Sequence, residues 1–230
     1  MILYELRASI RYGLERMAFK RFYRLLPAAV FTLLLGVIAA AAEPYRIVGF
    51  GDSLMAGYQL DAGQSFPEKL EAALKARGHD VTVANAGVSG DTTSAGLSRL
   101  DWSVPDDTDL VILELGANDM LRGIAPELTE KNLTAMIERL KERGIPVILS
   151  GMMAAPNLGA DYGDRFNRIY PELAEKYELP FYPFFLDGVA ATPALQLDDG
   201  MHPNAQGIDR MVQGVLPVVE KLLPATTGGG

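Results

Sequence analysis

The chain has 230 residues, enough for one sizeable α/β domain and too few for two comfortable ones. Hydrophobic residues make up 49% of the sequence, which argues against disorder, and the absence of cysteine excludes disulfides, a thiol nucleophile and thiolate metal sites. The formal net charge of −8 excludes the basic excess that nucleic-acid-binding domains carry.

The first 42 residues have the layout of a secretory signal peptide. Six Lys and Arg residues precede an uncharged apolar run from Leu25 to Ala42, and Ala40 and Ala42 are placed for peptidase cleavage before Glu43. Translation from Met17 would give a more ordinary basic leader. Because the run approaches the length of a membrane span, an uncleaved anchor in the inner membrane is the alternative. We expect cleavage, export to the periplasm and no stable membrane insertion afterwards.

Cleavage would leave 15 basic and 27 acidic residues, a formal charge of −12. So acidic a domain, without a basic stripe, argues against a nucleic-acid partner and suits a soluble exported protein. Since no repeat and no internal linker interrupts residues 43–224, we expect one domain there. Residues 225–230 (ATTGGG) are expected to be a flexible tail.

Apolar runs of strand length alternate with helical patterns along this domain. The predicted strands are Tyr45–Phe50, Val81–Asn85, Leu110–Leu115, Val147–Ser150 and Phe181–Phe184. The predicted helices are Phe66–Arg77, Thr93–Leu100, Thr129–Arg143, Asp164–Tyr177 and Asn204–Leu222. Runs of Val, Ile and Leu without alternation are typical of strands buried on both faces of a parallel sheet. The pattern predicts a three-layer α/β domain with a mainly parallel five-stranded sheet.

Polar, glycine-rich loops lie at the edge of this sheet where parallel strands end and ligands bind. They are 51–53 (GDS), 86–93 (AGVSGDTT), 116–120 (GANDM) and 198–204 (DDGMHPN). Four such loops at one edge are more than turn chemistry requires. The sequence therefore predicts a functional site there.

His202 is the one plausible imidazole base, because His79 lies at the opposite edge, where we expect a solvated turn residue. Asp199, three residues earlier, can bond the Nδ1–H of the ring and leave Nε2 free to accept a proton. The alternative is a helix N-cap with Pro203 at the first helical position. Ser53 is similarly either a nucleophile or a helix cap.

Acyl transfer also needs donors for an oxyanion. The backbone N–H of Ser53 can be one, the backbone of Gly90 a second and the side-chain amide of Asn118 a third. The alternatives are an ordinary turn at Gly90 and an Asx-turn at Asn118.

The blocks GDSL (51–54), SGD (89–91), GAND (116–119) and DDGMHP (198–203) resemble those of the SGNH (GDSL) hydrolase superfamily. The chain is similar to its bacterial periplasmic arylesterases and multifunctional acyl thioesterase/lysophospholipases. The resemblance implies a flavodoxin-like sheet, no metal and no cofactor. It also implies Ser53 as nucleophile, His202 as base with Asp199 as its partner, and Ser53, Gly90 and Asn118 as oxyanion donors. The loop 151–163 departs from the thioesterases in length, so aryl alcohol, lysophospholipid and thiol remain open as leaving groups.

Apolar, adaptable side chains cluster in sequence around these loops, and we expect them to bind substrate: Leu54, Met55, Met120, Leu121, Met152, Met153 and Met201. Methionine is common where a surface accepts varied apolar shapes. The alternative is that these side chains simply plug the edge of the sheet. A groove of this kind favours a small-molecule acyl or aryl ester as substrate.

The leading functional hypothesis is a serine esterase, with a carbohydrate O-deacetylase of the same superfamily as the alternative. A third hypothesis, from another class, is a non-catalytic flavodoxin-like module that binds a nucleotide or flavin. No Walker loop and no G-x-G-x-x-G follows a predicted strand, which argues against this module. The sequence does not indicate an oligomeric state.

Overall fold

The computed structural model describes residues 43–225, so the predicted signal peptide at 1–42 and most of the predicted tail lie outside the described residues. The strands are β1 (Tyr45–Gly51), β2 (Val81–Gly87), β3 (Leu110–Glu114), β4 (Val147–Ser150) and β5 (Phe181–Tyr182). The helices are α2 (Ser53–Ala56), α3 (Phe66–Ala76), α4 (Thr93–Ser103), α5 (Ala117–Leu121), α6 (Pro126–Glu142), α7 (Ala160–Tyr177) and α8 (Ala205–Glu220). Two short 3₁₀ helices cover Pro156–Leu158 and Pro193–Leu195.

The five strands form one parallel sheet in the order β2-β1-β3-β4-β5. The chain moves outward from β1 to β2 and then crosses back to β3 on the other side of β1. Ile47 of β1 consequently lies in register with Val83 of β2 and with Leu110 of β3. Such a reversal of strand order opens a crevice at the carboxyl ends of the strands.

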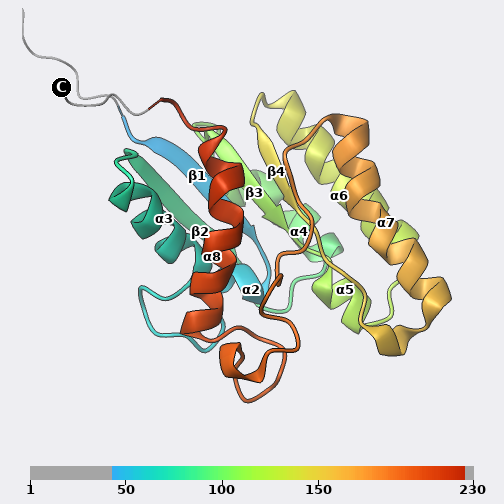
Figure 1. The fold of residues 1–230 in the computed structure, drawn as a ribbon. Helices are drawn as coiled ribbons and strands as arrows, with labels where there is room; N and C mark the ends of the chain where they lie inside the picture. The colour runs from blue at the N-terminus through green and yellow to red at the C-terminus, as the bar shows by residue number, and fades with distance from the viewer. Residues whose placement is uncertain (1–42, 226–230) are drawn as a thin grey trace, which may run out of the picture. The chain divides into compact units, whose positions relative to one another are not determined.

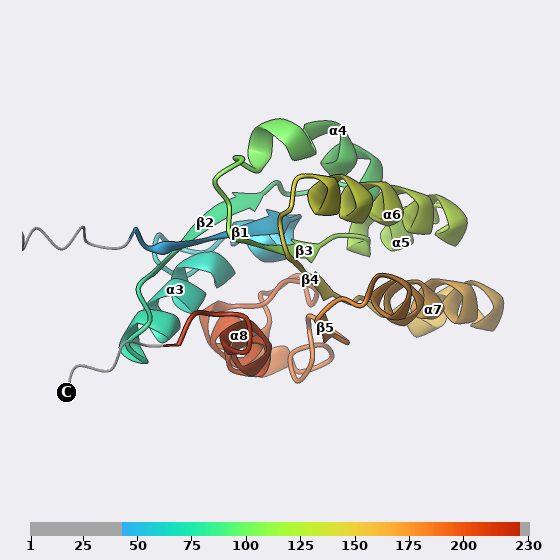
Figure 2. The same ribbon diagram turned by 90° about the horizontal axis from the view of Figure 1, so that it is seen from above.

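Helices cover both faces of the sheet, as Figures 1 and 2 show. Helices α3 and α8 pack together on one face, and α4, α6 and α7 lie on the other. The central strands β3 and β4 are buried along their whole length because both of their faces are covered. The predicted three-layer α/β architecture and parallel five-stranded sheet are confirmed.

The two edge strands differ from the central ones. In β2, buried Val81 and Val83 alternate with exposed residues, as expected of a strand that is covered incompletely. Strand β5 ends at Tyr182, two residues earlier than predicted, because Pro183 has no N–H to continue the ladder. Phe184, the residue after Pro183, therefore lies outside the sheet.

The helix boundaries follow recognisable signals. Gly78 and Gly144 have φ values of +85° and +71° and end α3 and α6, as the sequence predicts. Helix α6 begins three residues before the predicted Thr129, with Pro126 in its first turn. Helix α7 begins at Ala160 rather than Asp164. Helices α2 and α5 were not predicted, because four and five residues are too few to show a period.

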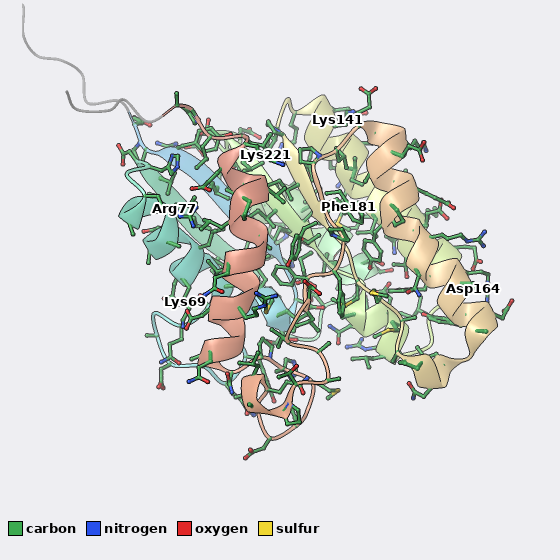
Figure 3. All side chains as sticks on the ribbon, viewed as in Figure 1. Lys69, Arg77, Lys141, Asp164, Phe181 and Lys221 are labelled. Atoms are coloured by element: carbon green, nitrogen blue, oxygen red, sulfur yellow. The ribbon has the colours of Figure 1, made fainter. Side chains whose placement is uncertain are left out.

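Ion pairs join α3 to α8, and Figure 3 shows Lys69 and Arg77 along α3. Lys69 Nζ lies 2.6 Å from Asp209 Oδ1, and Arg77 Nη1 lies 2.8 Å from Glu220 Oε2. His79, which we expected to be a solvated turn residue, is less exposed than predicted. Only 14% of its side chain is exposed, and its Nε2 is 3.7 Å from Glu220 Oε1, because α8 packs over the end of α3.

The close approach of β2 to α2 predicts a steric cost at Gly87. A Cβ on Gly87 would lie 2.3 Å from the backbone nitrogen of Ala56. Gly87→Ala should therefore lower the free energy of unfolding by about 1–3 kcal/mol, measured by urea denaturation. The control is Gly163→Ala in α7, where the nearest atom is 4.0 Å away. This helical substitution should stabilise by about 0.5–1 kcal/mol, and equal effects of the two changes would contradict the packing argument.

Candidate active site

Ser53 is the first residue of α2, directly after the carboxyl end of β1. The helix is capped by Asp52, whose Oδ1 accepts the Leu54 N–H at 3.0 Å. The Ser53 hydroxyl is therefore not used as a cap. Its Oγ instead lies 2.8 Å from His202 Nε2, across 149 positions of sequence.

His202 lies in the loop that leads into α8. Asp199 Oδ2 is 2.6 Å from His202 Nδ1, and Asp199 Oδ1 accepts the backbone N–H groups of Met201 and His202 at 2.9 Å each. The N-cap of α8 is Asn204, whose side chain accepts from two backbone N–H groups, so Pro203 precedes the helix. The capping alternative considered for Asp199 and His202 does not hold, and both side chains are free to contact each other.

The hydrogen bonds to Asp199 control its ionisation. Burial alone would raise its pKa, but the backbone N–H groups of His202 and Met201 and the imidazole ring outweigh it and lower the pKa to about 2. Asp199 is therefore ionised at neutral pH. An ionised carboxylate only accepts hydrogen bonds, so His202 Nδ1 carries the proton and Nε2 faces Ser53 as an acceptor.

An aromatic ring, which the sequence analysis did not single out, packs against the imidazole. The ring centroids of Tyr58 and His202 are 4.5 Å apart at an interplanar angle of 37°. Tyr58 belongs to the turn that follows α2, and Gln59 Nε2 donates to its hydroxyl at 3.1 Å. The GDSLMAGY stretch thus provides both the serine and a side chain that limits the movement of the histidine ring.

Gly90 lies in the loop after β2 with a φ of +85°, a conformation that favours glycine. Its carbonyl accepts from Arg122 Nη2 at 2.7 Å. Among residues 43–225, the backbone N–H groups of Ser53 and Gly90 have no hydrogen-bond acceptor. Both are therefore available to a bound ligand.

Buried Arg99 ties the loop that contains Gly90 to the end of β1. Its Nη2 donates to the Gly51 carbonyl at 2.9 Å, its Nη1 to the Ala86 carbonyl at 2.9 Å and its Nε to Asp91 Oδ2 at 2.6 Å. One guanidinium therefore fixes the ends of β1 and β2 and the SGD block to one another.

Asn118, in α5, faces the same crevice. Its Nδ2 donates to Asp52 Oδ2 at 3.0 Å. The next residue, Asp119, is completely buried and accepts from the Thr93 backbone N–H at 2.7 Å and from Thr129 Oγ1 at 3.2 Å. These contacts anchor α5 to α4 and α6, so Asn118 is held from both sides.

Two buried carboxyl groups lie directly behind the serine. The Asp52 backbone N–H donates to Glu114 Oε2 at 3.3 Å, and neither side chain is exposed to solvent. Burial is the largest effect on both groups, and it raises the pKa of Asp52 to about 6. Burial and the neighbouring Asp52 also raise the pKa of Glu114 well above its usual range.

A cavity of about 470 Å³ opens beside Ser53, Asn118 and His202. Its walls come from α2, from α5, from residues 152–156 and from the segment 184–202. Six of the seven side chains that we expected to bind substrate line it: Leu54, Met120, Leu121, Met152, Met153 and Met201. The rest of the wall was not predicted from the sequence: Ala117, Ala154, Ala155, Pro156, Phe184, Leu186, Ala190, Ala191, Gln196 and Gly200.

Met55 does not belong to this group, and the prediction that it binds substrate is wrong. It is fully buried, and its Sδ packs against β1 beside Gly49. The physical reason is helix geometry: Met55 follows Ser53 by two residues in α2 and so projects from the opposite side of the helix.

Within the described part of the chain, no cluster of three or more His, Asp or Glu side chains could hold a metal ion. No helix among these residues is long and apolar enough to cross a membrane.

The buried carboxyl of Glu114 predicts a pH dependence of stability. Since its pKa is about 4.3 in the unfolded chain and higher in the folded one, the folded state keeps a proton that the unfolded state loses. Stability should therefore decrease as the pH rises above about 4, until the folded pKa is passed. Because the amide of Glu114→Gln does not titrate, the free energy of unfolding of this variant should fall less than that of the wild type as the pH rises above about 4.

Urea unfolding across this range measures that slope, and a constant offset from the new amide does not affect it. Glu172→Gln, at an exposed position of α7, is the control and should keep the wild-type slope. An unchanged slope in Glu114→Gln would show that Glu114 does not hold a proton in the folded state.

Known proteins resemble this chain over most of its length. An arylesterase of Vibrio mimicus is 44% identical over 169 residues, which are 73% of this chain and 84% of that protein. Thioesterase 1/protease 1/lysophospholipase L1 of Escherichia coli is 35% identical over 195 residues, 83% of this chain and 91% of that protein. The crystal structure of AlinE4, an SGNH-hydrolase family esterase, matches with a TM-score of 0.67 and 49% identity over 81% of this chain and 100% of that one.

These likenesses confirm the SGNH hydrolase fold. The model of the GDSL-like lipase/acylhydrolase family matches residues 50–210, which include the last two residues of β1, the strands β2 to β5 and the loops at their carboxyl ends. The chain belongs to the GDSL-like lipase/acylhydrolase family.

Proposed function

We propose that this hydrolase cleaves carboxylic esters through an acyl-enzyme formed on Ser53, with His202 as general base and Asp199 as its partner. The contact that carries the proposal is the 2.8 Å approach of His202 Nε2 to Ser53 Oγ at the mouth of an apolar cavity. A serine hydroxyl is a weak nucleophile until an adjacent base takes its proton. The low pKa of Asp199 supports the tautomer of His202 that this role needs.

The steps follow from this geometry. Ser53 Oγ attacks the ester carbonyl while its proton passes to His202 Nε2, and Asp199 stabilises the imidazolium that forms. The oxyanion is bound by the free backbone N–H groups of Ser53 and Gly90 and by the Asn118 amide. His202 then protonates the departing alcohol, or the thiol of a thioester. Water, activated by His202, releases the acid from Ser53 in the same way.

The cavity favours an apolar acyl or aryl group over an acetylated sugar. Its lining consists mostly of Met, Leu, Ala and Phe side chains, with few groups that could bond sugar hydroxyls. The relatives named as arylesterase and as thioesterase/lysophospholipase support ester, thioester and lysophospholipid hydrolysis. Carbohydrate deacetylation remains the alternative, which release of acetate from acetylated xylan would detect.

We expect Ser53→Ala to abolish turnover of p-nitrophenyl esters, because within residues 43–225 the Ser53 hydroxyl is the group that contacts His202 Nε2. His202→Ala should be comparably severe, whereas Asp199→Ala should be milder since the ring retains its packing against Tyr58. The release of nitrophenolate is followed by its absorbance at 405 nm, on the order of seconds after mixing. A burst should appear only in those variants that form the acyl-enzyme. His79→Gln at the opposite edge is the control, and full activity in Ser53→Ala would refute the nucleophile assignment.

The cavity predicts that activity rises with acyl chain length. Each buried methylene contributes about 0.8 kcal/mol at most, so kcat/KM should rise a few-fold per added carbon from acetyl to a medium chain and then level off. Phe184→Ala should flatten this rise, because Phe184 lines the cavity. Phe181→Ala is the matched control, since Phe181 is also partly buried but is not part of the cavity wall. An optimum at acetyl would favour the deacetylase alternative.

We also propose that residues 1–42 direct export to the periplasm and are removed before Glu43. The basic leader, the apolar run and the small residues at its end support this proposal. Amino-terminal sequencing of the protein released from the periplasm should start at or near Glu43. Recovery of the full-length chain in the inner-membrane fraction would favour the anchor instead.

A further inference from the structure

We propose that Asp52 is a positioning residue for the reaction: it orients the Asn118 amide so that the NH₂ group, and not the carbonyl oxygen, faces the oxyanion. This inference rests on the proposed function, because it assigns a task to a neighbour of Ser53 in that mechanism. It concerns a side chain that contacts neither the substrate nor the reacting atoms.

The two oxygens of Asp52 have separate partners. Oδ1 accepts the Leu54 N–H and caps α2, and Oδ2 accepts from Asn118 Nδ2, each at 3.0 Å. A carboxylate has no proton to donate, so the end of the amide that it holds must be the NH₂ group. One hydrogen of that group bonds to Asp52, and the other remains for a ligand beside Ser53, where Asn118 lines the cavity.

Helix capping alone does not explain an aspartate at this position. An N-cap needs one acceptor oxygen, and asparagine and serine supply it about as well as aspartate. Asp52 is fully buried next to a second buried carboxyl, Glu114, which makes its negative charge costly. A neutral cap would avoid that cost. What asparagine could not supply is an acceptor that forces the direction of the Asn118 amide.

The remaining charged groups around Asp52 do not take over this task. Asp91 is held by Arg99, whose guanidinium bonds to Gly51 and Ala86 rather than to Asp52. Asp119 follows Asn118 but bonds to threonines of α4 and α6. Among the described residues, Asp52 is therefore the side chain that fixes the amide orientation.

The test is Asp52→Asn, which keeps the size and the cap. Its oxygen would stay on the Leu54 N–H, and its NH₂ group would then meet the NH₂ group of Asn118. Two donors cannot bond to each other, so the Asn118 amide should turn its oxygen toward the oxyanion. We expect kcat for a p-nitrophenyl ester to fall about 10²–10³-fold, as on loss of one oxyanion donor, with KM changed less than about two-fold.

A double-mutant cycle separates positioning from a general structural effect. If Asp52 acts through Asn118, then Asp52→Asn combined with Asn118→Ala should be no slower than Asn118→Ala alone. The thermal unfolding midpoint of Asp52→Asn should be equal to or above that of the wild type, because a buried charge is removed. Asp52→Ser is a second variant, which keeps one oxygen to cap α2 but lacks the second oxygen that accepts from Asn118, and it should show a smaller fall in kcat than Asp52→Asn.

Near-wild-type kcat in a folded Asp52→Asn would overturn the inference, as would multiplicative losses in the double variant. If Asp52→Asn does not fold, Asp52→Ser decides: unchanged kcat overturns the inference and a reduced kcat with unchanged KM supports it. Ser53→Ala in the same assay tests the proposed function by itself. A Ser53-dependent burst together with an unaffected Asp52→Asn would leave the esterase mechanism in place and reject only the role of Asp52.

Discussion

The position of β1 between β2 and β3 is the constraint on which the site depends. Because β1 pairs in parallel with both neighbours, the loops that follow the three strands leave the sheet at the same edge. These loops carry Ser53, Gly90 and Asn118, which are far apart in sequence. The Arg99 guanidinium then bonds to the carbonyls at the ends of β1 and β2 and prevents the two loops from separating.

The same edge concentrates buried charge, which a fold selected for stability alone would avoid. Arg99, Glu114, Asp52 and Asp119 are all buried, and only some of their charges are paired. Glu114, whose pKa is raised by burial and whose Oε1 lacks a hydrogen-bond partner among the described residues, adds no ion pair to this part of the fold. The favourable contributions to the free energy of folding come instead from the apolar strands and the helices that cover them. The rigid core therefore offsets a polar cluster whose value lies in the orientation of a few donors.

The sequence predicted the features that depend on local residue pattern, but it did not predict those that depend on how deeply a side chain is buried. Uniform apolar runs identified β3 and β4, and the edge strands β2 and β5 were less well bounded because incomplete cover gives a weaker pattern. The four loops could be placed because parallel strands share a direction. Met55 was assigned wrongly because proximity in sequence to Ser53 does not reveal on which side of α2 it projects. Burial of Asp52 and Glu114 has no signature in residue order, so their altered pKa values could not be foreseen.

The approach of His202 to Ser53 is set by packing at a distance from both. Asp199 fixes the histidine ring and the backbone that carries it, and the Leu197 N–H closes the loop on the His202 carbonyl at 2.8 Å. This loop is a local unit, and the contacts at the start of α8 set its position relative to Ser53. There Lys69 of α3 donates to the Ala205 carbonyl at 2.8 Å and pairs with Asp209. Because residues 57–65 connect α2 to α3, the α3–α8 contact links the position of the base to that of the nucleophile, although neither helix supplies a reacting group.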